Sequence, residues 1–164
     1  MDAVTIELGR RDDAFAVRKA VFMDEQGYEN EFEPLDDHPD CIHVTAHVAG
    51  EAVGCARTFP HAAECAANAD PHPLSASPLD AIADGQTTFV FGRLAVLPAY
   101  RRRGLGRELI GAAERAARDA GARLMKLHAQ EYVRGMYEAL GYVQISEVDY
   151  EDEGQPHLWM AKRL

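Results

Sequence analysis

The chain has 164 residues, of which 47% are hydrophobic and 27% are charged, and its formal net charge is -10. This size and composition are typical of one globular domain, here residues 1–164. No apolar run reaches the ~18 residues of a membrane span, and the first residues lack the pattern of a secretory signal. The cysteines Cys41, Cys55 and Cys65 are odd in number and have no metal-ligand spacing. They predict free thiols, no bound metal and a cytoplasmic protein.

The charge is distributed unevenly along the chain. Residues 93–134 carry ten basic and four acidic side chains, whereas residues 20–56 contain no lysine or arginine. Such a separation indicates one region that attracts an anion and another that attracts a cation. Composition alone fits a solvated surface with uneven charge equally well.

Hydrophobic periodicity in the first half of the chain predicts a strand, a helix and a β-hairpin. The expected ranges are 4–8 for the strand, Asp12 or Asp13 to about Gln26 for the helix, 28–40 for a loop or short helix, and 41–48 and 51–59 for the hairpin. An aspartate at the helix start can accept hydrogen bonds from first-turn amides. Gly27 can end the helix because glycine adopts the left-handed conformation without penalty. Ala49 and Gly50 supply the hairpin turn.

Residues 61–86 are rich in Ala, Pro, Asp and Ser and show no clear period. Loops of this length inside a compact domain are usually mobile or functional. We expect a mobile surface insertion with one helical turn near residues 62–67.

The second half of the chain alternates buried strands with helices. The expected ranges are 87–97, 124–129, 142–148 and 157–161 for strands and 104–120 and 131–140 for helices. Glu114 stands one helical turn before Arg118, which favours an ion pair between them. The whole order, βα, ββ, βα, βα, ββ, predicts an α/β fold in which helices cover a mixed sheet.

The stretch YRRRGLGREL, residues 100–109, links a predicted strand to a predicted helix. The first turn of a helix exposes unpaired amides and the positive end of the helix dipole, which together bind phosphate readily. Gly104 and Gly106 let an anion approach the backbone, and the arginines add attraction and forked hydrogen bonds. The stretch therefore predicts a diphosphate-binding turn. A basic helix start on the surface would match the same short pattern.

Three other phosphate ligands fit less well. A nucleoside-triphosphate loop needs G-x-x-x-x-G-K-[ST], which the sequence lacks. The dinucleotide fingerprint G-x-G-x-x-G needs glycine where Leu109 stands, and an acid where Lys126 and His128 lie. Nucleic-acid binding needs more than one basic cluster on a chain of charge -10.

The same stretch resembles the acetyl-CoA-binding segment of the GNAT N-acetyltransferases, in which a strand ending in V-x-P precedes [QR]-x-x-G-x-[GA] and a helix. Arg101, Gly104 and Gly106 occupy the three marked positions. Downstream, Tyr137 and the run at 140–142, Leu-Gly-Tyr, resemble the family's Y-x-x-x-G-[FY].

Two further segments resemble one branch of that family. V-F-x-x-E-Q at residues 21–26 and P-H-x-x-M at residues 156–160 are similar to segments of the ElaA/YjcF-like branch. Together the resemblances cover most of the chain apart from residues 61–86.

The resemblance implies the GNAT fold, a central and mostly antiparallel sheet flanked by helices. Its fourth and fifth strands are parallel and splay apart to admit the pantetheine arm of the cosubstrate, acetyl-CoA. Backbone groups of the fourth strand would bind pantetheine, and amides of the arginine-glycine turn would bind the diphosphate. The implied cofactor-binding residues are Leu94, Ala95, Val96, Arg101, Arg102, Arg103, Gly104, Leu105, Gly106 and Arg107.

The resemblance also implies transfer of an acetyl group to a primary amine by direct attack, through a tetrahedral intermediate. Tyr137 occupies the family's position for the acid that protonates the thiolate leaving group; its alternative role is packing against Val133. The base stays open between Glu25, His128, His157 and a water relay. Each of these side chains could instead be structural.

The acidic residues between positions 25 and 37 precede the hairpin, where this family places much of its acceptor wall. We therefore hypothesise a small cationic amine as the acceptor. We expect neither nucleic acid nor a membrane as a partner, and we leave a homodimer open. The alternative function is a non-catalytic acyl-CoA sensor or interaction module, because a degenerate acceptor site would be invisible in the sequence.

Overall fold

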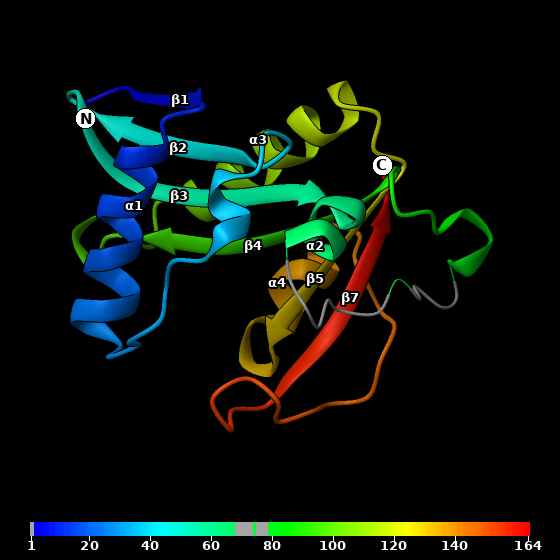
Figure 1. Ribbon diagram of the computed structural model, residues 1–164. Helices are drawn as coiled ribbons and strands as arrows, with labels where there is room; N and C mark the ends of the chain where they lie inside the picture. The colour runs from blue at the N-terminus through cyan, green and yellow to red at the C-terminus, as the bar shows by residue number, and fades with distance from the viewer. Residues whose placement is uncertain (1, 68–73, 75–78) are drawn as a thin grey trace.

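The computed structural model describes residues 2–67, 74 and 79–164. Its strands form one mixed sheet in the order β1-β2-β3-β4-β5-β7-β6, with helices on both faces (Figure 1). The strands are β1 Val4–Leu8, β2 Ile42–Val48, β3 Glu51–Pro60, β4 Thr88–Val96, β5 Leu124–Gln130, β6 Val143–Gln144 and β7 His157–Arg163. The α-helices are α1 Arg11–Arg18, α2 His61–Ala67, α3 Leu105–Asp119 and α4 Arg134–Ala139. Short 3-10 helices span Pro34–Asp37, Asp80–Ile82, Pro98–Tyr100 and Glu131–Val133.

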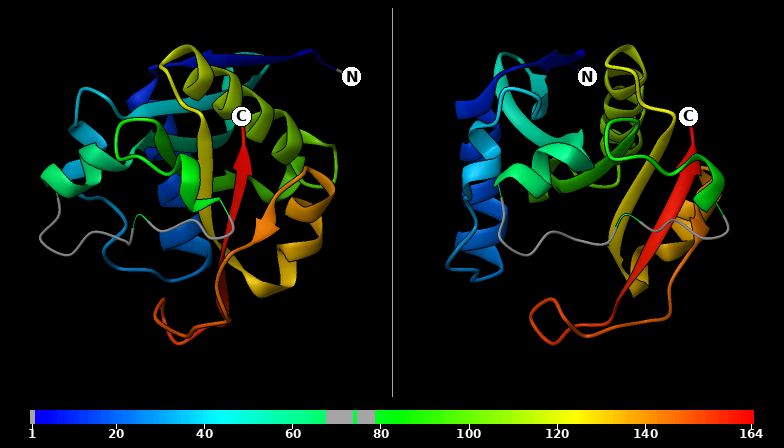
Figure 2. Two further views of the ribbon diagram at one scale, coloured as in Figure 1. Left: turned by 90° about the vertical axis from the view of Figure 1, so that its right-hand side faces the viewer. Right: turned by 45° about the vertical axis from the view of Figure 1, so that its right-hand side comes forward.

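The pairing of the strands confirms the predicted α/β fold. Among the described strands, only β4 and β5 pair in parallel, and every other neighbouring pair is antiparallel. On one face, α3 buries a stripe that includes Leu105, Leu109 and Ala113. On the other face α1 packs through Val17 against Cys55 of β3, so the two helices lie on opposite sides of the sheet (Figure 2).

Two turns follow the predicted glycine chemistry. Gly27 has a φ of +80° just after the first helical segment ends. Ala49 and Gly50 have φ of +50° and +85° and join β2 to β3 in a two-residue hairpin turn, the kind whose twist suits an antiparallel pair. These local predictions are confirmed.

The beginning of α1 differs from the prediction. Arg10 is the N-cap residue, and no side chain caps the helix, so the expected cap by Asp12 or Asp13 is wrong. Asp13 instead bonds to His47 on β2, 3.0 Å from its Nε2, and forms an ion pair with Arg10. The helix then continues as a π-helix, η1 Lys19–Glu25, a form often found at functional sites.

Residues 61–86 are more than a surface insertion. The expected helical turn is present as α2, which begins directly after β3 and buries three of its seven residues. Ala63 of this helix packs against Phe59 at the end of β3. The remainder of the prediction falls mostly on residues 68–73 and 75–78, outside the described residues.

Two predictions in the carboxyl-terminal third are corrected by side-chain hydrogen bonds. The strand expected at 142–148 has only two residues, because the hydroxyl of Ser146 replaces a backbone acceptor for the amide of Trp159. Glu114 does not pair with Arg118; it accepts hydrogen bonds from the Tyr142 hydroxyl (3.0 Å) and from Lys162 (3.0 Å). Both partners are distant in sequence.

The three cysteines are free thiols, as predicted. Burial raises the pKa of Cys41 to about 11 and that of Cys55 to about 12, which leaves both thiols protonated and unreactive. In the part of the chain that the structure describes, no helix has the length and apolarity that crossing a bilayer requires.

Candidate active site

β4 and β5 separate after the first four residue pairs of their parallel ladder. The ladder runs from Thr88–Leu124 to Phe91–Leu127, although both strands continue beyond it. Figure 1 shows β5 and β7 running away from β4 at this end of the sheet. A cavity of about 530 Å³ lies there, lined by β4, β5, the loop after η1, the segment around α4 and the turn before β7.

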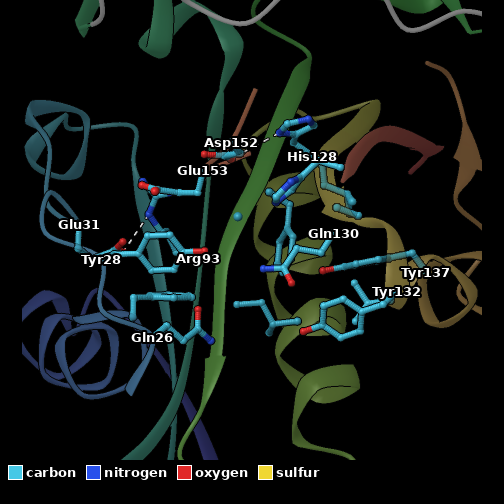
Figure 3. A pocket seen from close by; sticks show the side chains of 18 of the residues that line it. Gln26, Tyr28, Glu31, Arg93, His128, Gln130, Tyr132, Tyr137, Asp152 and Glu153 are labelled. Atoms are coloured by element: carbon cyan, nitrogen blue, oxygen red, sulfur yellow. Dashed lines mark ion pairs between the residues drawn. The ribbon is translucent and has the colours of Figure 1, made fainter. Parts of the chain in front are cut away.

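A β-bulge directs β4 into this cavity. The register between β3 and β4 shifts after the Cys55–Ala95 pair, which leaves one extra residue on β4. Arg93, in the bulge, has a φ of +54°, a left-handed conformation that is uncommon for residues other than glycine. Its side chain lines the cavity and forms an ion pair with Glu31, at 3.0 Å between Nε and Oε1 (Figure 3). Such strained conformations are most frequent at functional sites.

The edge of β4 that faces the opened gap carries backbone polar groups. The amide of Leu97 donates to the carbonyl of Val53 on β3 (2.8 Å). Because these groups alternate along a strand, those of Val96 and Leu94 point toward the gap. They are available to an extended ligand, although the Val96 carbonyl already accepts a hydrogen bond from Nε of Arg101 (2.8 Å).

The turn between β4 and α3 presents backbone amides that find no acceptor among the described residues. Arg102 and Gly104 have φ of +62° and +82°, and Gly104 is the N-cap of α3. After Arg101, the first described amide that donates a backbone hydrogen bond is that of Glu108, to the Gly104 carbonyl (3.2 Å). A Cβ at Gly104 or Gly106 would meet no atom within 4 Å, so both glycines face open space. These residues fit a diphosphate at a helix amino end.

Arg101 and Glu25 form a two-bond ion pair beside this turn. Nη1 and Nη2 of Arg101 donate to the two carboxylate oxygens of Glu25 at 2.8 and 2.7 Å. The hydrogen bonds from Arg101 lower the pKa of Glu25. Glu25 does not line the cavity, so this conformation does not favour its predicted role as the base.

Tyr137 reaches the cavity from α4. Only 6% of its surface is exposed, and burial raises the pKa of its hydroxyl. In Figure 3 its hydroxyl, the hydroxyl of Tyr132 and the amide of Gln130 point into the cavity from one side, opposite Tyr28. The raised pKa keeps the hydroxyl protonated, and because no described residue bonds to it, it is available to a ligand.

Two stacked histidines line the cavity near the carboxylates of the turn before β7. Nε2 of His128 lies 2.9 Å from Asp149 and Nδ1 lies 3.6 Å from Asp152. Burial alone would lower the pKa of His128, but these carboxylates outweigh burial and raise it. The ring of His157 stacks on that of His128 at 4.9 Å, and its Nδ1 lies 2.8 Å from the Gln155 carbonyl. Nδ1 of His157 therefore donates to this carbonyl, so Nε2 is the ring nitrogen that could accept a proton.

Lys126 does not face the cleft with His128. It is fully buried on β5, with Nζ 4.7 Å from the centre of the Trp159 ring, and it is absent from the cavity lining. Burial lowers its pKa to about 8.

The acidic segment predicted as an acceptor wall is largely neutralised from within the protein. The ion pairs are Arg18 with Glu31 and Asp36, Arg57 with Glu33 and Asp36, Arg93 with Glu31 and Glu33, and Arg11 with Asp37. Arg18 is 1% exposed and donates to Asp36 at 2.6 Å. Most of these carboxylates therefore have a structural role: they connect the segment before β2 to arginines of α1, β3 and β4.

The cavity brings together only some of the residues that the sequence singled out. Leu94, His128, Tyr137 and His157 line it, as do Glu29 and Glu31 of the acidic segment, whereas the arginine-glycine turn lies outside its lining. Sequence reasoning missed five lining residues of suitable chemistry: Tyr28, Arg93, Gln130, Tyr132 and Asp152. None of them belongs to a motif. The one signal in the sequence is the cluster of acidic residues at 149–154, which includes Asp152.

Comparisons with known proteins agree with this geometry. Residues 10–142 match the family model described as "Acetyltransferase (GNAT) family". Two proteins of Bacillus subtilis (strain 168) are similar in sequence. "Putative acetyltransferase BSU40680" is 33% identical over 92% of this chain and 87% of its own. "Uncharacterized N-acetyltransferase YjcF" is 30% identical over 92% of this chain and 90% of its own.

Solved structures share the fold. Escherichia coli ElaA superposes with a TM-score of 0.74 at 20% identity, covering 98% of this chain and 99% of its own. An aminoglycoside 6'-N-acetyltransferase complexed with coenzyme A gives a TM-score of 0.68 at 17% identity, covering 98% and 96%. The splayed sheet and the amide-lined turn define an acyltransferase fold. The chain belongs to the GNAT acetyltransferase family, and its similarity to YjcF and ElaA confirms the predicted resemblance.

Proposed function

We propose that this protein transfers an acetyl group from acetyl-CoA to a small primary amine. The observation that carries the proposal is the juxtaposition of two features: a turn of unbonded amides at the start of α3, and a polar cavity where β4 leaves β5. The first suits a diphosphate, and the second suits a reacting thioester beside an acceptor. The GNAT family assignment supports acetyl-CoA as the donor.

The cofactor-binding residues predicted from the sequence fit coenzyme A. Backbone groups of Leu94 and Val96 would pair with the pantetheine amides, as an added strand does. Amides from Arg102 to Gly106 would hold the diphosphate, and the exposed arginines of the turn would attract the phosphates. Bound there, acetyl-CoA would supply an activated acyl group at the cavity.

Tyr137 is the proposed acid. As the nitrogen–carbon bond forms and the carbon–sulfur bond breaks, the sulfur leaves as a thiolate that needs a proton or a hydrogen bond. The Tyr137 hydroxyl points into the cavity, and its raised pKa keeps it protonated at neutral pH. Its contact with Tyr142, edge-on at 5.7 Å between ring centres, holds the ring in place.

His157 is favoured as the proton acceptor over Glu25 and His128. Both ring nitrogens of His128 face carboxylates, and Glu25 is bonded to Arg101. Nε2 of His157 carries the lone pair of a ring whose orientation is fixed by the Gln155 carbonyl and by the stack on His128. It would take the proton of the attacking amine directly or through one water.

The proposed acceptor remains a small cationic amine, now supported by part of the acidic segment and by the turn before β7. The titratable groups of the cavity lining include Glu29, Glu31, Arg93, His128, Asp152, Glu153 and His157. Since Glu31 is paired with arginines and Asp152 with His128, the attraction for a cation would come mainly from Glu29 and Glu153. A marked preference for anionic amines would contradict this part of the proposal.

Release of CoA thiol from acetyl-CoA in the presence of a panel of primary amines tests the proposed reaction. Tyr137→Phe is expected to lower kcat by about 100-fold, the size of a lost acid, and to leave the affinity for CoA unchanged. Tyr132→Phe is the matched control, since its hydroxyl points into the same cavity, and is expected to keep most of the activity.

His157→Gln is expected to lower kcat by at least about tenfold, with partial recovery on adding imidazole, because a free base can replace a missing one. CoA binding without turnover on any amine would favour the second candidate function, a non-catalytic acyl-CoA sensor. Full activity of Tyr137→Phe would remove the tyrosine from the mechanism.

A further inference from the structure

The side chain of Arg101 connects three segments that are far apart in sequence. Its Nε donates to the Val96 carbonyl at the end of β4, and its two other nitrogens donate to Glu25, 76 residues earlier. Arg101 itself begins the turn whose amides lead into α3. The strand that faces the gap, the proposed diphosphate turn and the end of η1 are therefore joined through one guanidinium.

Glu25 is the last residue of η1, and the loop that follows it lines the cavity. The helix end is closed by three amides: Gln26 donates to Val21, Gly27 to Met23 and Tyr28 to Phe22, at 2.9 to 3.1 Å. Residues 26–31 then form one wall of the cavity. Because Glu25 directly precedes these residues in the chain, a displacement of Glu25 would also displace this wall.

The ion pair is not required for the stability of the fold. The side chains of Arg101 and Glu25 are 38% and 36% exposed, and exposed ion pairs contribute little to stability. η1 is held on the sheet independently, since Val21 is buried against the sheet in the same cluster as Cys55 and Ala95. The two parallel hydrogen bonds fix the orientation of the Glu25 carboxylate relative to the Arg101 guanidinium, which suits a positioning role.

We infer that Glu25 is a positioning residue that couples the cofactor turn to the acceptor wall through Arg101. The inference rests on the proposed binding of CoA at that turn. When the turn is held by a ligand, Arg101 is held with it, and Glu25 fixes the end of η1 and the wall at 26–31. Because such coupling is reciprocal, an acceptor that orders the wall would in turn strengthen CoA binding.

Hydrogen exchange of the amides of Gln26, Gly27 and Tyr28, measured with and without CoA, tests the inference. These amides exchange when the helix end opens, so they report on the wall without knowledge of the acceptor. In the unmodified protein, saturating CoA is expected to slow them by about two- to fivefold, the range set by an exposed ion pair. Glu25→Ala is expected to abolish this slowing while CoA, measured by calorimetry, still binds.

Asp24→Ala is the matched control. Asp24 precedes Glu25 on the same π-helix and forms an exposed ion pair with Lys19, at 3.2 Å. This variant is expected to keep the CoA-dependent slowing. Arg101→Gln, which cannot form the two-bond pair, is also expected to lose the slowing at saturating CoA; its affinity for CoA is not part of the test, because Arg101 belongs to the proposed cofactor-binding turn.

Each other result overturns the inference in a distinguishable way. If CoA slows exchange equally in Glu25→Ala and in the unmodified protein, the effect comes from direct contact and the ion pair has no such role. If CoA binds the unmodified protein without slowing these amides, no coupling exists. If CoA does not bind at all, the proposed function fails together with the coupling.

Discussion

Two groups of arginines with similar chemistry differ in what surrounds them. Arg18, Arg57 and Arg93, here the inner arginines, share the carboxylates of Glu31, Glu33 and Asp36, and Arg18 is 1% exposed. Arg102, Arg103 and Arg107, here the turn arginines, are exposed and form no ion pair with any described residue.

The contrast shows why charge along the sequence was an uncertain guide to function. The acidic stretch before β2 looked like a surface for a cationic ligand, yet most of its carboxylates are used by the inner arginines. Of the four arginines in the basic turn, Arg101 is paired with Glu25, but the three turn arginines are left unpaired by the described residues, so the turn still indicates an anionic ligand. A charge indicates a ligand only where the protein itself leaves that charge unpaired.

The largest difference between the two groups is expected in the free energy of unfolding, when Arg18 is replaced by methionine (Arg18→Met). Removing Arg18 leaves the buried carboxylates of Glu31 and Asp36 without their main partner, which costs about 3 to 5 kcal/mol of unfolding free energy. Arg103→Met, the control among the turn arginines, is expected to change stability by less than about 0.5 kcal/mol. Urea unfolding of both variants measures the difference. Equal stabilities would mean that the inner arginines are not structural.

The second-largest effect is expected from acidification, which should weaken the stabilisation that the inner arginines provide through Asp36. Burial would raise the pKa of Asp36, but its bonds to Arg18 and the charge of Arg57 outweigh burial and hold the pKa well below its usual value. The stabilisation is therefore complete above the unfolded pKa of about 4 and is lost as the pH falls toward the folded value. Urea midpoints between pH 7 and pH 3 should fall more steeply for the unmodified protein than for Asp36→Asn. If the urea midpoints of the two proteins fell in parallel with pH, Asp36 would not be the source of the pH dependence.

The smallest effect is expected on the affinity for CoA, when the charges of the turn arginines are removed. Replacing Arg102, Arg103 and Arg107 by glutamine is expected to weaken CoA binding by about tenfold at low salt, with a smaller loss at high salt because ions screen exposed charges. Stability should not change. Arg115→Gln, an exposed site further along α3, is the control and should bind CoA normally. A salt-independent loss would show that the triple replacement distorts the turn.

The parts of the fold that depend on local periodicity or on the cofactor motif could be predicted from the sequence. The alternation of β1, the apolar run of β4 and the stripe of α3 each follow from neighbouring residues, and so does the glycine turn before α3. Tyr137 and His157 were found only through resemblance to the family, since a tyrosine on a helix or a histidine on a strand has no chemical signal of its own.

Long-range partners could not be predicted. Glu114 bonds to Lys162, 48 residues away, and not to its helical neighbour Arg118. Arg93 enters the cavity because of a β-bulge that no local pattern marks. Glu25, one of the candidates for the base, is bonded to Arg101, which lies 76 residues away in the sequence. In each case a tertiary contact outweighed the local preference.

Calorimetry on ligand-free protein tests the central claim most directly, that the amides at the start of α3 bind the diphosphate of coenzyme A. CoA should give saturable heat with a Kd between about 1 µM and 1 mM, the usual range for such substrates. Pantetheine, which lacks the diphosphate, should bind at least about 100-fold more weakly, since it cannot reach the turn. No heat with millimolar CoA, or equal affinity for CoA and pantetheine, would contradict the account.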